Sequence, residues 1–194
     1  MNQQLPGSAF AKVDKATFYA FAEENEGRFE YEDGYVVEQM DGGTKKHFRL
    51  CARFLRALED RLDPTDWIVL AGHAVDLPEA VRFPDVVVEP AVTPDESLFT
   101  AKPALIVEVL SPSSVTRDLA RKAEEYCAVP TLAAYVVASQ DEAACKVWVR
   151  DETGRMPGEP EARVGLDATI RVPALALELP LADIYTGIVD ANGS

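Results

Sequence analysis

A nearly continuous apolar run, from Ala104 to Leu110, constrains the fold of this chain more than any other feature. Such runs are typical of strands buried on both faces, because a strand with one wet face alternates apolar and polar residues. The run therefore predicts an α/β fold in which a sheet is covered on both sides and this strand lies near its centre. Further strands are expected at 67–75, 85–88, 133–139, 146–150, 168–172 and 176–179.

Helical patterns alternate with these strands. Asp14 can cap a helix that extends to about Asn25, with Gly27 as a stop. An amphipathic helix is expected at 44–62 and a third helix at 115–128, after a turn and cap at 111–114. The apolar stripe of the second helix consists of Phe48, Cys51, Leu55, Leu58 and Leu62.

Turn-forming residues mark two connections. Residues 28–40 alternate in strand fashion around Asp33 and Gly34, a dipeptide favoured in two-residue hairpin turns because both central residues need a positive φ. This pattern predicts a β-hairpin. Residues 89–103 are rich in proline and acidic side chains, which indicates a surface loop that could act as a flap.

Composition limits the partners that the chain can bind. Its 194 residues are 47% apolar, which suits one domain over 1–194, and 19 Lys and Arg against 33 Asp and Glu give a net charge of −14. Bulk charge this negative does not coat nucleic acid or membrane, so a phosphate-bearing partner has to be held locally. No run approaches the ~20 apolar residues of a membrane helix, and the first residues lack the core of a signal peptide. We therefore expect a cytoplasmic protein without a membrane partner.

The cysteines and histidines exclude some metal sites. Cys51, Cys127 and Cys145 are odd in number and lack CxxC spacing, so they are interpreted as reduced packing residues rather than as a disulfide framework or a zinc site. A His-rich metal site is excluded because His47 and His73 are the only histidines.

Three charged residues occupy positions where the pattern calls for apolar ones. Glu108 lies inside the central run, where a carboxylate is costly unless it is paired, protonated or bound to a cation. Lys122 falls in the inward stripe of the third helix, so it either extends past the core to solvent or points at the sheet. Asp85 opens a strand after Pro84, where a strand-start cap is the common alternative.

These three side chains indicate phosphodiester chemistry if they converge at one end of the sheet. Two carboxylates can bind Mg²⁺ or Mn²⁺ through oxygen, and the metal polarises a phosphoryl group and activates a water. The lysine would offset charge on the phosphate oxygens or orient the water. Local positive charge for DNA is available on the outward face of the second helix, although an ordinary solvated face is an equal alternative. This basic face consists of Lys45, Arg49, Arg53 and Arg56.

The order of several motifs resembles that of the Uma family of restriction endonucleases, a branch of the PD-(D/E)xK nuclease superfamily. The motifs span about 28–185 and are RFEYEDGYVVEQM, KKHFRLCARFL, VRFPDVVV, ALIVEVLSPSS, RDLARKAEEY and LALELPLADIY. The resemblance implies a restriction-endonuclease-like α+β fold, a mixed sheet flanked by helices. It also implies a Mg²⁺ cofactor, which Mn²⁺ can replace, with Asp85 and Glu108 as catalytic metal ligands. The superfamily pattern has a lysine two residues after the glutamate, and this chain has Leu110 there. In the Uma branch that lysine is displaced to the next helix, and Lys122 matches the displaced position.

Glu30 and His47 also match positions of the family, and both have alternative interpretations. Glu30 falls on a hairpin face with Glu32 and Gln39 that is expected to be wet, and Glu38 on the opposite face is a competing candidate. His47 is either a base beside the metal or a residue of the helix cap. The chain departs from the family pattern at Gln39 and after Tyr126.

Two functions follow. The first is a Mg²⁺-dependent endonuclease that acts on DNA, as a homodimer because enzymes of this superfamily that cut both strands commonly pair two active sites. The second is a non-catalytic interaction protein that keeps the nuclease fold. The net charge favours the second function, whereas the presence of Asp85, Glu108 and Lys122 favours the first.

Overall fold

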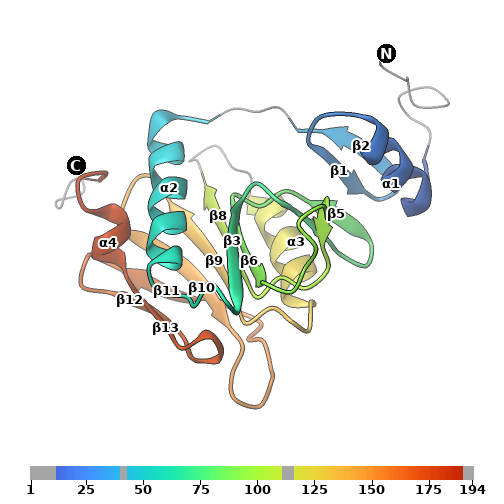
Figure 1. The fold of residues 1–194 in the computed structure, drawn as a ribbon. Helices are drawn as coiled ribbons and strands as arrows, with labels where there is room; N and C mark the ends of the chain where they lie inside the picture. The colour runs from blue at the N-terminus through green and yellow to red at the C-terminus, as the bar shows by residue number, and fades with distance from the viewer. Residues whose placement is uncertain (1–11, 40–42, 111–115, 190–194) are drawn as a thin grey trace.

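A six-stranded mixed sheet lies at the centre of the computed structural model, which describes residues 12–39, 43–110 and 116–189 (Figure 1). In spatial order its strands are β11 (Glu161–Val164), β10 (Ala144–Val149), β9 (Ala134–Ser139), β8 (Leu105–Leu110), β6 (Val86–Pro90) and β3 (Trp67–Ala71). The central strands β8 and β9 are parallel, and the other neighbours are antiparallel. A parallel pair needs a crossover connection, which helix α3 (Thr116–Cys127) supplies. The predicted mixed, helix-flanked sheet is confirmed.

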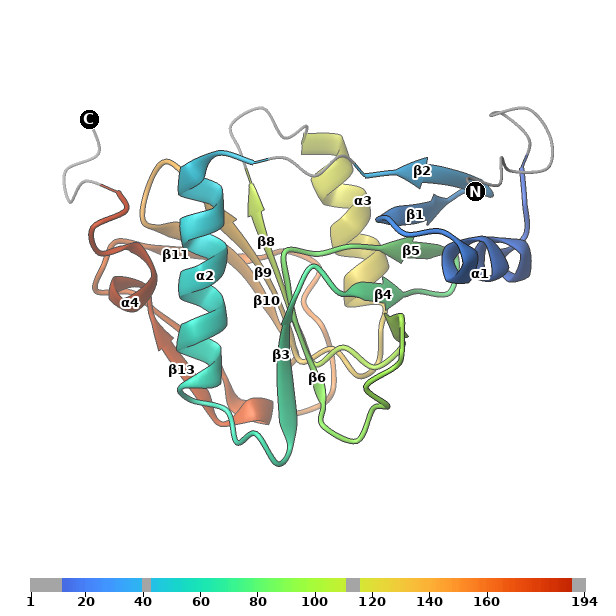
Figure 2. The same cartoon turned by 45° about the horizontal axis from the view of Figure 1, so that its top comes forward.

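Both faces of this sheet are covered (Figures 1 and 2). One face packs against α2 (Lys45–Glu59), the short helix α4 (Leu181–Tyr185) and a ribbon of β12 (Thr169–Val172) and β13 (Leu177–Pro180), with a 3₁₀ turn η1 (Pro173–Leu175) between these strands. Helix α3 packs on the other face. Successive residues of β8 alternate between the two cores: Val107 lies on the α2 side and Ile106 on the α3 side. Glu108 therefore belongs to the α3 side.

A smaller sheet packs beside the large one (Figure 2). Its strands, in spatial order, are β2 (Tyr35–Glu38), β1 (Phe29–Glu32), β5 (Ala80–Arg82), β4 (Ala74–Asp76) and β7 (Phe99–Thr100), and helix α1 (Lys15–Glu24) covers it. Strands β1 and β2 form the predicted hairpin, with positive φ at Asp33 and Gly34. The predicted cap of α1 is also present, because the Asp14 side chain accepts a hydrogen bond from Thr17 N.

Several sequence predictions differ from the structure in detail. Phe48 is 58% exposed, because the buried stripe of α2 runs through Leu50, Phe54 and Ala57 together with Cys51 and Leu58. The strand predicted at 67–75 is two strands, since the chain bends at Gly72 (φ +57°) and passes to the smaller sheet. Strands β5, β7 and β11 were not predicted. The predicted turn and cap at 111–114 lies outside the described residues. Among the described helices, none has the length and apolar character of a membrane span.

Candidate active site

Lys122 and Glu108 meet where α3 packs on the large sheet. The Lys122 Nζ atom lies 3.2 Å from Glu108 Oε1, so this lysine points at the sheet. The Tyr126 hydroxyl, one turn further along α3, donates to the same carboxylate oxygen at 3.3 Å. Tyr126 was not among the predicted site residues; it lies four residues from Lys122, which places both side chains on one helix face.

Asp85 lies next to Glu108 at the start of β6. The antiparallel register pairs Val86 with Val107, so the adjoining position places Asp85 beside Glu108. The Asp85 Oδ2 atom accepts a hydrogen bond of 2.7 Å from the backbone N–H of Val109. Each carboxylate thus comes from one of two neighbouring strands, and the lysine comes from the helix above them.

Glu108 is electrostatically perturbed in this position. The residue is 7% exposed, and burial raises the pKa of its carboxyl group to about 7. The ammonium of Lys122 lowers the pKa, whereas the negative charge of Asp85 raises it further. One lysine therefore does not offset the cost of two adjacent carboxylates, and a bound cation would favour the ionised form of Glu108.

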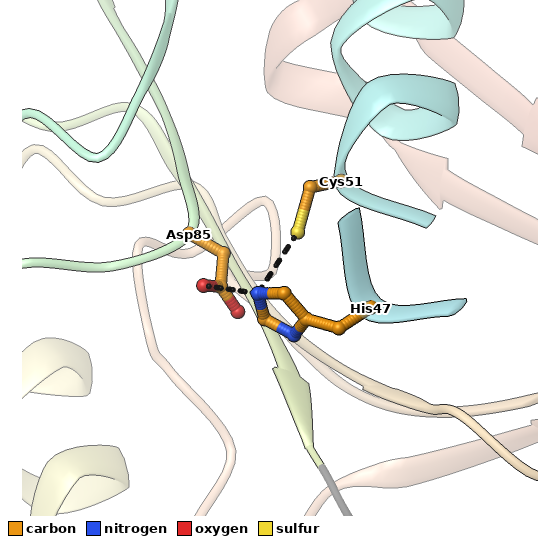
Figure 3. A group of neighbouring side chains, drawn as sticks. All are labelled: His47, Cys51 and Asp85. Carbon is orange, nitrogen blue, oxygen red and sulfur yellow. Dashed lines mark hydrogen bonds and ion pairs between the residues drawn. The ribbon is translucent and has the colours of Figure 1, made fainter. Parts of the chain in front are cut away.

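His47 and Cys51 approach Asp85 from the first turns of α2 (Figure 3). The His47 Nε2 atom lies 3.3 Å from Asp85 Oδ1 and 3.5 Å from Cys51 Sγ, and its Nδ1 atom lies 3.2 Å from the carbonyl oxygen of Val109. Hydrogen bonds with Asp85 and Cys51 raise the pKa of His47 to about 10. His47 is therefore next to Asp85. The sequence placed Cys51 only in the apolar stripe, because a cysteine fits that pattern without further signal.

Glu30 occupies a buried position, so the prediction that its hairpin face is wet is wrong for this residue. It is 4% exposed and accepts hydrogen bonds of 3.1 Å from Arg82 Nη1 and from the backbone N–H of Phe83. Arg82 also pairs with Glu32 and Glu125, which ties the hairpin to α3. The cause is the pairing of β1 with β5, which brings Glu30 against Arg82. Glu38, the competing candidate, is exposed.

The predicted basic face of α2 is exposed, but two of its four side chains contact the end of the chain. Arg49 Nη2 donates to the carbonyl oxygen of Gly187 at 2.7 Å, and Arg53 Nη1 to that of Asp183 at 3.5 Å. Lys45 and Arg49 lie nearest to His47 along the helix, each two residues from it, and Arg56 lies furthest from it. The face therefore begins near Asp85 and extends away from it along α2.

Comparisons with known proteins give a family match and a fold match. Residues 16–182 match the Uma2 family profile, described as "Putative restriction endonuclease", which confirms the resemblance inferred from the motifs. The crystal structure of a putative nuclease belonging to DUF820 from Anabaena variabilis is similar, with a TM-score of 0.69 over 84% of this chain and 94% of that chain. At 16% sequence identity this match concerns the fold. An uncharacterised protein of Synechocystis sp. is 27% identical over 157 residues, which cover 77% of this chain and 80% of the relative.

Proposed function

This chain belongs to the Uma2 family of restriction-endonuclease-like proteins, and from that premise we propose that it hydrolyses DNA phosphodiester bonds with the help of Mg²⁺ or Mn²⁺. The observation that carries the proposal is the buried Glu108 carboxylate on the central strand, in contact with Lys122 and adjacent to Asp85. Burial of the Glu108 charge beside a second carboxylate lowers the stability of the fold, and the contact with Lys122 does not fully compensate for this. Such a buried acid points to a functional role.

The side chains present fit a hard divalent cation. Asp85 and Glu108 offer carboxylate oxygens, the ligands that Mg²⁺ prefers, and both lie at the same end of two neighbouring strands. The pKa of Glu108 is raised chiefly by burial and further by the negative charge of Asp85, and a bound cation would favour the ionised carboxylate against both. Asp85 and Glu108 would therefore hold the metal.

Each neighbouring group has a specific task in this proposal. Bound Mg²⁺ would polarise the phosphoryl group and lower the pKa of an attacking water. The backbone N–H of Val109 orients Asp85, and the Tyr126 hydroxyl orients Glu108. The Lys122 ammonium offsets charge that develops on the phosphate oxygens. His47 holds Asp85 through Nε2 as a positioning residue, because its raised pKa keeps the imidazole protonated and unable to accept a proton.

Glu30 acts as a positioning residue in this proposal. Its carboxylate accepts the backbone N–H of Phe83, two residues before Asp85, and so fixes the chain that carries this acid. Contact with DNA would start at Lys45, near the acids, and continue along the basic face of α2. A homodimer would bring two such sites to the two strands of a duplex, and light scattering with and without DNA tests this assembly.

The proposed function is tested by cleavage assays with conservative substitutions. Wild type is expected to cut supercoiled or linear DNA in Mg²⁺ or Mn²⁺ and to stop in EDTA, whereas Asp85→Asn and Glu108→Gln are expected to be inactive but folded. Glu159→Gln, which changes an exposed acid, is the matched control and should cut like wild type. Equal cleavage by wild type and both site variants would assign the activity to a contaminant or to another site.

An interaction protein that keeps the nuclease fold is the second candidate. Its support is the net charge of −14 together with Arg49 and Arg53, which donate to backbone carbonyls of the same chain. The discriminating experiment is DNA binding by wild type at low salt with Ca²⁺ in place of Mg²⁺. Absence of measurable affinity there would favour this second candidate.

A further inference from the structure

His47, Cys51 and Asp85 form a compact group with three different ligand atoms (Figure 3). One imidazole nitrogen, one thiol sulfur and one carboxylate oxygen all lie within 4.8 Å of one another. Magnesium rarely takes sulfur or nitrogen ligands, whereas zinc is bound by this combination. The chemistry of the group therefore differs from that of the Asp85 and Glu108 pair.

Two of the three separations within the group match those of a tetrahedral zinc site. With bonds of about 2.0 Å to nitrogen and oxygen and about 2.3 Å to sulfur, tetrahedral geometry gives a nitrogen–oxygen edge of about 3.3 Å and a nitrogen–sulfur edge of about 3.5 Å. In this chain the His47 Nε2 atom lies 3.3 Å from Asp85 Oδ1 and 3.5 Å from Cys51 Sγ. The sulfur of Cys51 and the carboxylate oxygen of Asp85 lie within 4.8 Å of each other, so a cation could bind all three atoms once this edge is about 3.5 Å.

Helix α2 and the backbone of Val109 hold the three ligands in this arrangement. His47 and Cys51 are four residues apart on α2, so their side chains project from one face of the helix. The second ring nitrogen of His47 faces the carbonyl oxygen of Val109 at 3.2 Å, a contact that Nδ1–H can keep while Nε2 exchanges its proton for a metal. The N–H of the same Val109 fixes Asp85 through its other carboxylate oxygen. Val109 thus orients two of the three ligands.

Two of the three side chains of the group are partly accessible from solvent. Cys51 is buried, at 9% exposed, whereas the side chains of His47 and Asp85 are 16% and 23% exposed. A cation could enter past the imidazole and the carboxylate and meet the thiol behind them. Three protein ligands leave the fourth position of a tetrahedral ion to solvent.

From this geometry we propose that His47, Cys51 and Asp85 bind a thiophilic divalent cation of the zinc type. Binding replaces the thiol proton of Cys51 and any proton on His47 Nε2 by bonds to the metal, and these protons pass to solvent. Asp85 then belongs to this site and also to the Mg²⁺ site; the second membership rests on the proposed function. Binding at the three residues does not depend on DNA cleavage.

Cobalt provides the direct test, because Co²⁺ replaces zinc and reports its ligands by absorption. Titration of the metal-free full chain with Co²⁺ is expected to produce a near-ultraviolet thiolate-to-cobalt charge-transfer band and the intense visible bands of a tetrahedral ion. Added Zn²⁺ should displace Co²⁺ and so remove both the charge-transfer band and the visible bands. Cys51→Ser is expected to lose the charge-transfer band, and His47→Gln to raise the dissociation constant by more than about tenfold. Cys127→Ser is the matched control and should keep the wild-type spectrum, because its partly buried thiol lies outside the group.

A charge-transfer band that survives in Cys51→Ser, or its absence from wild type at saturating Co²⁺, would overturn the proposal. X-ray absorption at the zinc edge of the wild-type protein covers the case in which a variant fails to fold. It should show one sulfur scatterer at about 2.3 Å, and a shell of oxygen and nitrogen alone would contradict the site. None of these readouts measures cleavage, so failure here and failure of the proposed nuclease function are distinguishable.

Discussion

The carboxyl group of Glu108 makes stability depend on pH in a specific direction. Its pKa is raised to about 7 from an ordinary value of 4.5, chiefly by burial. Between these values the unfolded chain releases the proton and the folded chain keeps it, so the contribution of Glu108 to the free energy of unfolding falls as pH rises from about 4.5 to about 7 and is constant on either side.

Glu108→Gln removes this dependence. In EDTA, the stability of the variant relative to wild type is expected to increase by on the order of 2 kcal/mol between pH 5 and pH 8. Urea denaturation at the two pH values measures the change. Parallel stability profiles for the two proteins would show that Glu108 does not titrate in this range.

Lys122 is expected to affect the rate of cleavage more than the binding of the cation. Lys122→Met keeps the aliphatic stem but removes the ammonium, and single-turnover cleavage should slow by roughly 10²-fold or more. Mn²⁺ affinity should be retained, because both carboxylates remain. Lys146→Met, at an exposed site on β10, is the control. An unchanged rate in Lys122→Met would remove this lysine from the mechanism.

The site residues that could be predicted from the sequence were charged residues at positions where the local pattern calls for apolar ones. Glu108 and Lys122 interrupt apolar positions, and the structure brings them into contact. Cys51 and Tyr126 are acceptable at apolar positions, so nothing in the sequence indicated that one contacts His47 and the other Glu108. The burial of Glu30 depends on pairing between strands about fifty residues apart, which local alternation does not encode.

At the scale of elements, Arg82 connects the small sheet to α3. It is 1% exposed and binds Glu30, Glu32 and Glu125. Arg82→Met leaves the buried Glu30 without its cation, so the free energy of unfolding should fall by roughly 3–5 kcal/mol.

Thermal or urea unfolding checks this prediction. Arg82→Met combined with Glu30→Gln should recover part of the stability, because the buried charge is then gone. Arg171→Met, which breaks an exposed pair with Glu178, should cost at most about 1 kcal/mol. Similar destabilisation by Arg82→Met and Arg171→Met would mean that the Arg82 network is not stabilising.

The basic face of α2 is expected to contribute to DNA binding by pairing with several phosphates. Replacing Arg49, Arg53 and Arg56 with Ala should weaken binding and reduce the slope of log affinity against log salt by roughly 0.9 for each phosphate that is no longer neutralised. Fluorescence anisotropy in Ca²⁺ at several salt concentrations measures this slope, with the exposed Arg155→Ala as control. An unchanged slope would place the DNA elsewhere.

The same substitutions are not neutral for the fold. Arg49 and Arg53 hydrogen-bond to backbone carbonyls near the end of the chain, and removing each bond costs about 0.5–1.5 kcal/mol. Binding should therefore be measured well below the melting temperature of the variant.

Elements with strong local signals were predicted well. The cap of α1, the hairpin turn and the apolar run of β8 each leave a pattern within a few residues. Strands β5 and β7 have three and two residues, too few for a period to be visible. The division of residues 67–75 between two sheets depends on what each half pairs with, so the sequence did not reveal it.

For the whole molecule, the net charge of −14 leads us to predict that DNA binding depends on the cation. Without metal, the carboxylates of Asp85 and Glu108 repel phosphate, whereas a bound cation reverses the local charge. Affinity for DNA in Ca²⁺ is therefore expected to exceed affinity in EDTA by about tenfold or more.

Isothermal titration or anisotropy measures both affinities. A variant that carries Asp85→Asn and Glu108→Gln together should show little of the difference between Ca²⁺ and EDTA. Binding of equal strength by wild type in the two conditions would show that the acids do not face the DNA.

The overall architecture came from the order of the motifs rather than from composition. Charge and apolar content restricted the size and partners of the chain, but they contain no information on strand order. The family match across residues 16–182 agrees with the mixed sheet, whose parallel pair β8 and β9 follows from the crossover through α3.

The most direct test of the proposed Mg²⁺ site is a crystal of the full chain soaked in Mn²⁺ and measured at the manganese absorption edge. We predict an anomalous peak that joins the carboxylates of Asp85 and Glu108, with the Lys122 ammonium beside it. A dataset at saturating Mn²⁺ with no peak between these two carboxylates would contradict the proposed mechanism.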